Sequence, residues 1–366
     1  MKEPIDGIAT ALRIAMVAPL HESVPPQLYG GTERVVSFLT EELVEFGMDV
    51  TLFATGDSKT NARLRPGAPR GLRMDSGTHD RLAYHFAMIH DVMESADEFD
   101  VVHFHIDYLH YPLSRAMGLN QVTTLHGRLD LPELLPLYRR FDDMPLVSIS
   151  DAQRGPLPFC NWVATVHHGL PDDLLAFSPK ASGYLAFLGR ISPEKGPDRA
   201  IRIAQRAGRP LKIAAKVDSA DREYYEAVVK PLIASGGDVE FVGEIGDADK
   251  AAFLGGATAL LCPLDWPEPF GLVMIEALAC GTPVVAWPAG SVPEIVRDGV
   301  NGRIVTSEDE AVAALAAIEQ IERVECRRDF EQRFTAERMA RDYLKVYRRL
   351  LDSAGISPSP VLRQSA

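Results

Sequence analysis

Two glutamates with seven residues between them are the first candidates for chemistry in this sequence. Glu268 lies in a proline- and glycine-containing stretch at 266–271, and Glu276 lies in the helix-like stretch that follows. A carboxylate accepts hydrogen bonds from two neighbouring hydroxyl groups, so this pair suits a ligand rich in hydroxyls. Backbone N–H groups at a helix start attract anions, which makes 270–273 a candidate diphosphate cradle. The alternative is that neither glutamate binds a ligand, with Glu268 lying on the surface and Glu276 being an ordinary helical residue, because such a spacing often arises by chance.

Two cations form the second candidate group. Arg190 and Lys195 follow an apolar, strand-like run at 184–188. A leaving diphosphate gains negative charge as its bond to carbon breaks, and cations held there stabilise the transition state selectively. A planar guanidinium can bind two phosphate oxygens, whereas an ammonium acts as a point charge. The alternative is two exposed charges, one of them paired with Glu194.

A paired glycine opens the first long helical pattern of the chain. Gly30 and Gly31 precede Thr32, and glycine lets backbone N–H groups approach a phosphate or a sugar closely. The alternative is a plain loop in which Thr32 caps the helix. No GxGxxG pattern occurs in the first half, which weakens a nicotinamide-binding interpretation.

Histidines gather after two predicted strands of the first half. His126 directly follows the strand predicted at 122–125, so we expect its side chain to point towards the ligand-binding edge of a parallel sheet. The alternative is a structural role, which is more common for a lone histidine. His103, His105 and Asp107 alternate at the end of another strand, so that His103 and His105 share one face. A metal site needs further ligands, and packing or acceptor contact is the favoured interpretation.

Alternating strand-like and helix-like segments must position these residues. Apolar runs at 12–18, 50–54, 101–105, 122–125 and 146–149 predict strands of the first half, with a helix over 32–46. The pattern restarts with strands at 184–188, 211–215, 239–242, 259–262 and 284–286. Such alternation predicts an α/β protein with two doubly wound, Rossmann-like domains that face each other across a cleft.

The predicted boundaries follow from loop composition. We expect an N-terminal domain over 1–170, a C-terminal domain over 171–334, a final helix over 335–352 that crosses back to the first domain, and a disordered tail over 353–366. The 366 residues are long for one domain and natural for two.

Charge and cysteine content exclude several classes of function. The formal net charge of −13 argues against a nucleic-acid partner. Four scattered cysteines without a CxxC pair fit a reducing compartment, and no run approaches the length of a membrane span. We therefore expect a soluble, cytoplasmic protein without an integral membrane segment. Arg63, Arg65, Arg70 and Arg73 form a modest basic group that is interpreted as a solvated loop.

These motifs together resemble the retaining glycosyltransferases of family 4, which have the GT-B fold. Their mark is the glutamate pair followed by a helix and a Gly-Thr-Pro-Val-Val stretch, here at 281–285. The resemblance extends from about residue 12 to residue 351. It implies a nucleotide-diphosphate sugar as donor and a sugar, a lipid-linked molecule or a small molecule as acceptor.

The resemblance also implies roles for individual residues. The donor sugar would be held by Glu268, His126 and the backbone of Phe270, Gly271 and Leu272, and the diphosphate would be bound by Gly30, Gly31, Arg190 and Lys195. The ribose would be bound by Glu276, and the base would be lined by Gly243, Glu244 and Ile245. The acceptor side would include Asp107 and Thr32. No cofactor and no metal are expected, because Arg190 and Lys195 can do a metal's electrostatic work. The Asp247-Ala248-Asp249 triplet is interpreted as acidic residues at a helix start.

The activity that follows is metal-independent sugar transfer by a front-face route, in which the donor phosphate takes the acceptor's proton. UDP-sugars are the favoured donors and GDP-mannose is next, for synthesis of a cell-surface glycan, a glycolipid or a small-molecule glycoside. The alternatives are a catalytically silent nucleotide-sugar-binding module and a nucleotide-sugar epimerase of the same fold. A phosphorylase would need a pyridoxal-binding lysine, and none stands out. Oligomeric state stays open.

Overall fold

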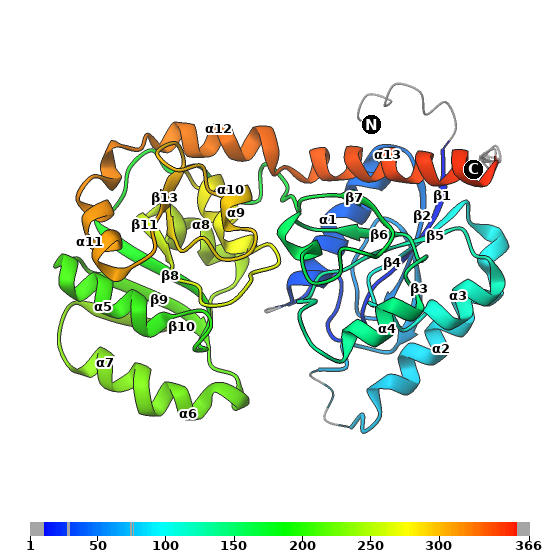
Figure 1. Cartoon of the computed structure of the whole chain (residues 1–366), viewed down its shortest axis with the longest axis horizontal. Coiled ribbons are helices and arrows are strands. Elements are labelled where there is room, and N and C mark those ends of the chain that lie inside the picture. The colour runs from blue at the N-terminus through cyan, green and yellow to red at the C-terminus, as the bar shows by residue number, and fades with distance from the viewer. Residues whose placement is uncertain (1–10, 28–29, 74, 76, 357–366) are drawn as a thin grey trace. The chain divides into compact units, whose positions relative to one another are not determined.

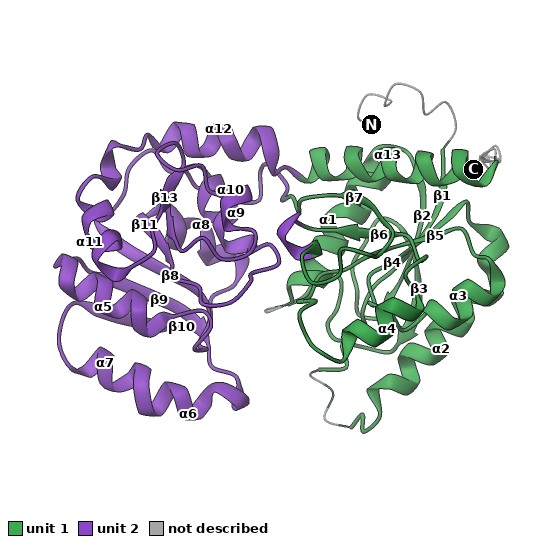
Figure 2. Cartoon of the chain, in the orientation of Figure 1, with its two compact units in different colours: residues 1–149, 154–169, 336–366 green, residues 150–153, 170–335 purple. Residues whose placement is uncertain are grey.

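The computed structural model describes residues 11–27, 30–73, 75 and 77–356. The chain divides into two compact units, which Figure 2 colours separately. Unit 1 comprises residues 1–149, 154–169 and 336–366, and unit 2 comprises residues 150–153 and 170–335. Figure 1 labels the elements of both units.

Unit 1 is built on a parallel sheet to which seven strands contribute among the described residues. Their order across the sheet is β3 (Arg63–Ala68), β2 (Asp49–Thr55), β1 (Arg13–Val17), β4 (Val101–Phe104), β5 (Gln121–Thr124), β6 (Leu146–Ser148) and β7 (Trp162–Thr165). The order runs in opposite directions from β1 and from β4. The carboxyl ends of these two strands therefore flank a switch point, where doubly wound sheets bind ligands.

Helices cover both faces of this sheet (Figure 1). They are α1 (Gly31–Glu45), α2 (Arg81–Glu94), α3 (Tyr111–Met117), α4 (Leu134–Arg140) and α13 (Ala336–Ala354). Alternate side chains of a strand point to opposite faces. On one face, Phe104 packs in a cluster with Met88 and Ile89 of α2. On the other, His103 meets Tyr347 of α13.

Unit 2 repeats the architecture with a parallel sheet of six described strands. Their order is β10 (Val239–Gly243), β9 (Leu211–Lys216), β8 (Tyr184–Arg190), β11 (Ala257–Cys262), β12 (Val284–Ala286) and β13 (Gly302–Ile304). Its helices are α5 (Pro197–Ala207), α6 (Arg222–Tyr224), α7 (Lys230–Ala234), α8 (Asp247–Gly255), α9 (Leu272–Ala279), α10 (Val292–Ile295), α11 (Glu308–Ala316) and α12 (Arg323–Arg333). The switch point of this sheet lies between β8 and β11.

The predicted class, two doubly wound parallel sheets, is confirmed. The sequence pattern did not predict the outer strands β3, β7 and β13. Strand β3 was expected to be a solvated loop because it carries arginines. In the structure it pairs with β2 at the sheet edge, where Arg63 lies 3.6 Å from Asp49 and Arg65 forms an ion pair with Glu98. An edge strand with an exposed side can carry such charges.

Two boundaries differ from those expected. Residues 150–153 belong to unit 2, because the Ser150 hydroxyl donates to the carbonyl of Pro269 at 2.7 Å and the N–H groups of Asp151 and Ala152 donate to Glu294. The final helix, which belongs to unit 1, continues to Ala354, so residues 353 and 354 are helical rather than part of a tail. The rest of the predicted tail from residue 357 lies outside the described residues.

Within the described part of the chain, none of the helices combines the length and the apolar character needed to cross a bilayer.

Candidate functional site

The loop after β11 and the loop after β8 bring a lysine, a glutamate and a tryptophan together in unit 2. Lys195 donates a hydrogen bond to Glu268, and the indole N–H of Trp266 donates to the same carboxylate at 3.0 Å. The Lys195 ammonium also lies 4.6 Å from the centre of the Trp266 ring, within cation–π range. Glu268 is 7% exposed. The structure thus joins two residues that the sequence placed 73 positions apart.

Arg190 is the last residue of β8 and points its guanidinium at two carboxylates. Its Nη2 donates to Glu194 at 2.7 Å, and its Nε lies 3.2 Å from Asp221 without hydrogen-bond geometry. The sequence reading considered Glu194 as a partner for one of the two cations, and Arg190 is that cation. Asp221 was not predicted, because it lies 31 positions away, at the end of a short 3-10 helix with no recognisable motif. An incoming diphosphate would compete with these carboxylates for the guanidinium.

Glu276 is the most deeply buried carboxylate of the predicted set, with 2% of its surface exposed. It lies in α9, and its Oε1 accepts a hydrogen bond of 2.6 Å from the ammonium of Lys250 in α8. Its Oε2 is buried and has no hydrogen-bond partner in the described part of the chain. Lys250 belongs to no recognisable motif, so it was not predicted from the sequence.

Glycines and a serine shape the loop that carries Glu268. Helix α9 begins at Leu272 after Gly271, which has a φ of 81°. Phe270 is buried, and its carbonyl accepts a hydrogen bond of 2.7 Å from the Ser291 hydroxyl. A Cβ on Gly290, whose φ is 58°, would collide with the backbone of Glu268. Gly290 and Ser291 therefore fix the conformation of the loop that carries Glu268, and neither residue was predicted from the sequence.

The three residues assigned to the nucleotide base lie at the end of β10 and in the turn before α8. Gly243 closes the strand with a φ of 80°, Glu244 is exposed and Ile245 is half-buried. Helix α8 then starts at Asp247, with acidic residues in its first turn as predicted.

In unit 1 the glycine loop lies partly outside the described residues, since Tyr29 is not among them. Gly30 is buried against Pro26, and α1 starts at Gly31. Thr32 is therefore the second residue of the helix, and no side chain caps it. The suggested threonine cap is wrong, because the helix begins two residues before the position that a capping Thr32 would require.

A cluster of buried imidazoles surrounds His126. His105 Nδ1 lies 2.8 Å from His126 Nε2, and the rings of His126 and His168 stack with centroids 5.2 Å apart. His103 and His105, predicted to share a face, have ring centroids 4.0 Å apart. His103 also bonds the hydroxyls of Tyr347 and Thr124, at 2.8 and 2.7 Å.

Burial keeps these imidazoles neutral. Desolvation lowers the pKa of His126 to about 3 and holds the pKa values of His103, His105 and His168 well below the ordinary value. Neutral imidazoles next to one another can alternate as hydrogen-bond donors and acceptors.

Asp107 follows the histidines in an exposed position with a φ of 51°, which is uncommon for a residue with a side chain. The described residues contain no group of three or more His, Cys, Asp and Glu side chains arranged to hold a metal ion. The favoured interpretation of His103 as a packing residue agrees with its two hydrogen-bonded nitrogens.

Family models match the two halves of the chain in sequence. Residues 29–177 match "Glycosyltransferase Family 4", and residues 177–337 match "Glycosyl transferases group 1". The chain belongs to this glycosyltransferase family. The expectation of an enzyme of this family is confirmed, as is the GT-B fold.

Curated proteins and solved structures are similar to this chain. A D-inositol 3-phosphate glycosyltransferase of Mycolicibacterium gilvum is 30% identical over 222 residues, covering 54% of this chain and 45% of that protein. The chain thus spans less than half of that relative. AviGT4, a glycosyltransferase involved in avilamycin A biosynthesis, is 24% identical with a TM-score of 0.71, covering 93% of this chain and 98% of that one. HepE of Anabaena, solved with UDP and glucose, is 18% identical with a TM-score of 0.73, covering 92% and 100%.

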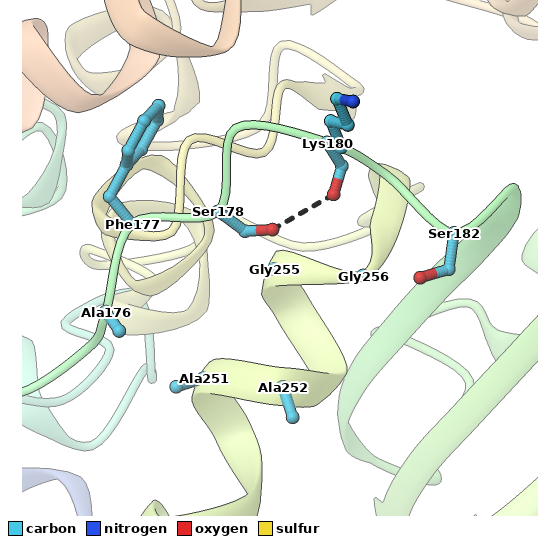
Figure 3. Close-up of a pocket in the computed structure, with 9 residues that line it drawn as sticks. All are labelled: Ala176, Phe177, Ser178, Lys180, Ser182, Ala251, Ala252, Gly255 and Gly256. Atoms are coloured by element: carbon cyan, nitrogen blue, oxygen red, sulfur yellow. Dashed lines mark hydrogen bonds between the residues drawn. The ribbon is translucent and has the colours of Figure 1, made fainter.

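A separate surface pocket of about 300 Å³ lies in unit 2 of the glycosyltransferase (Figure 3). The segment with Phe177, Ser178 and Lys180 forms one side, and the end of α8 forms the other. The Ser178 hydroxyl donates to the carbonyl of Lys180 at 3.0 Å. The lining includes no residue of the predicted donor set, so the pocket is not the candidate site.

Proposed function

We propose that this glycosyltransferase moves a sugar from a nucleotide-diphosphate donor to an acceptor with retention of anomeric configuration. The observation that carries the proposal is the set of charged groups at the switch point of unit 2. There Arg190 ends β8, Lys195 lies in the loop after it, Glu268 follows β11, and Glu276 lies one helix turn into α9. Cations for a diphosphate and carboxylates for hydroxyls are the two chemistries that such a donor requires.

A bound donor would replace the carboxylate partners of the two cations with its phosphates. In the structure Lys195 is paired with Glu268 and Arg190 with Glu194. A donor would bring phosphates to the cations and sugar hydroxyls to Glu268, so that each charge exchanges one polar partner for another. As the glycosidic bond breaks, Arg190 and Lys195 stabilise the growing charge on the leaving diphosphate.

The remaining assignments follow the family resemblance. Glu268, His126 and the backbone of 270–272 contact the donor sugar, Gly30 and Gly31 contact the diphosphate, and residues 243–245 contact the base. Asp107 and Thr32 belong to the acceptor side. The acceptor's proton passes to a donor phosphate oxygen on the same face, so no enzyme nucleophile is required.

UDP-sugars are the favoured donors, which the presence of UDP and glucose in the HepE structure supports, and GDP-mannose is next. Inositol phosphate is the acceptor named for the Mycolicibacterium relative, but the match covers only 45% of that protein. The acceptor class we propose is therefore a sugar, a lipid-linked molecule or a small molecule, used in the synthesis of a cell-surface glycan, a glycolipid or a glycoside. No cofactor or metal is part of the proposal.

Release of nucleoside diphosphate tests the activity. Wild-type enzyme with a UDP-sugar and an acceptor panel should release UDP, and the product's anomeric configuration should match that of the donor. Arg190→Ala and Lys195→Ala should each lower turnover by roughly 10²-fold, the scale of one lost transition-state donor. A protein that binds donor but releases no diphosphate with any acceptor is a silent binding module. Conversion of the UDP-sugar to its epimer without net release of UDP would instead indicate the epimerase.

A further inference from the structure

The environment of Glu276 is incomplete in a specific way. The residue is 2% exposed, its Oε1 accepts one hydrogen bond from Lys250, and its buried Oε2 has no partner among the residues that the structure describes. A buried polar atom left without a partner costs about 1–3 kcal/mol, and more when it is charged. Such an atom is a candidate acceptor for a hydrogen-bond donor that a ligand supplies.

Lys250 is the described side chain that hydrogen-bonds Glu276. It is 13% exposed, and its ammonium also lies 3.4 Å from Asp247 at the start of α8. An ammonium has three N–H groups. The contacts with Glu276 and Asp247 therefore hold Lys250 between the carboxylate assigned to the ribose and the turn assigned to the base.

We propose that Lys250 is a positioning residue for the nucleotide, which holds the Glu276 carboxylate through Oε1 and leaves Oε2 as the acceptor for the ribose hydroxyls. The inference rests on the proposed function, because it requires a ribonucleotide at Glu276. Burying a carboxylate is unfavourable unless a positive charge is paired with it. Lys250 supplies that charge from one side only, through Oε1, so that the other oxygen remains for the ligand.

The alternative is that Lys250 only joins α8 to α9. The two roles differ in which nucleotides they affect. A structural joint would support every nucleotide equally, whether or not the sugar carries hydroxyls. A positioning residue for the ribose supports binding only when the hydroxyls are present, because its effect passes through their hydrogen bonds to Glu276.

The test compares Lys250→Met with wild type by isothermal titration calorimetry. The probes are whichever of UDP, GDP and ADP wild type binds most tightly and the 2′,3′-dideoxy form of the same nucleotide. Lys250→Met should weaken binding of the ribonucleotide by about tenfold or more, on the scale of a lost charged hydrogen bond, and binding of the dideoxy form by less than about twofold. Lys230→Met, which removes an exposed lysine paired with Glu226, is the matched control and should change neither.

Two results overturn the inference. Equal weakening of both nucleotides would make Lys250 a structural joint, and no weakening of either would make it irrelevant to the site. If Lys250→Met does not fold, Lys250→Gln is measured in its place. The proposed function fails separately: wild type would then bind none of the three ribonucleotides, or would not distinguish a ribonucleotide from its dideoxy form.

Discussion

The imidazole of His105 hydrogen-bonds the imidazole of His126, with 2.8 Å between Nδ1 and Nε2. The second nitrogen of His105, Nε2, lies 3.0 Å from the sulfur of Met16. A thioether sulfur can only accept a hydrogen bond. The three side chains therefore form a directed chain in which the proton positions are determined from one end.

The direction of this chain predicts the tautomer of His126. With its Nε2 proton directed at Met16, His105 must accept at Nδ1, so His126 donates from Nε2 and its Nδ1 carries a lone pair. Nitrogen-15 NMR of histidine-labelled protein should show His126 protonated at Nε2 only, with His126→Asn used for assignment. Met16→Leu, which keeps the volume but removes the acceptor, should make both tautomers of His105 visible. A protonated Nδ1 on His126 in wild type would contradict the assignment.

The buried imidazoles also predict how stability depends on pH. Burial lowers the pKa values of His103, His105, His126 and His168, whereas the same residues in the unfolded chain titrate near 6.5. Below pH 6.5 the unfolded chain takes up protons that the folded chain does not. The contribution of these histidines to the free energy of unfolding is therefore complete well above pH 6.5. It is lost as pH decreases, by up to about 1.4 kcal/mol per pH unit for each histidine.

Urea unfolding at pH 7.5, 6.5 and 5.5 measures this dependence. The unfolding free energy should fall moderately over the upper interval and about three times as much over the lower one. His79→Gln, which changes an exposed histidine, is the control and should leave the profile as it is in wild type. Equal stability at pH 7.5 and 5.5 would show that the imidazoles take up protons in the folded state.

Gly290 provides a test of how the Glu268 loop is held. Its φ of 58° disfavours any side chain, and a Cβ would collide with the backbone of Glu268. Gly290→Ala should therefore lower the melting temperature and abolish measurable donor binding. Gly299→Ala is the matched control: its φ is 77°, and the nearest atom to a Cβ is the Arg303 guanidinium at 3.6 Å. That variant should show only backbone strain, about 1 kcal/mol. Equal effects of the two substitutions on binding would remove the special role of Gly290.

The sequence was sufficient for most strands of the parallel sheets because apolar runs of three to seven residues alternate with helical periodicity. It was insufficient for β3, where Arg63 and Arg65 give an edge strand the composition of a loop. Among site residues, Arg190, Lys195, Glu268 and Glu276 were named from motifs. Lys250, Asp221 and Ser291 were not, since each acts through a partner more than 20 positions away. Contacts of that kind depend on the fold and leave no local pattern.

The central claim is that unit 2 binds a nucleotide-sugar donor, and a thermal-shift screen tests it most directly. Wild type, Glu276→Ala and Arg190→Ala are compared with UDP-, GDP-, ADP- and TDP-sugars, with Arg206→Ala as a control that removes an exposed arginine paired with Asp309. We predict that one nucleotide class raises the melting temperature of wild type and of the Arg206 variant, and that both site substitutions weaken this shift. Absence of a shift with every donor at millimolar concentration would contradict the assignment of the donor site.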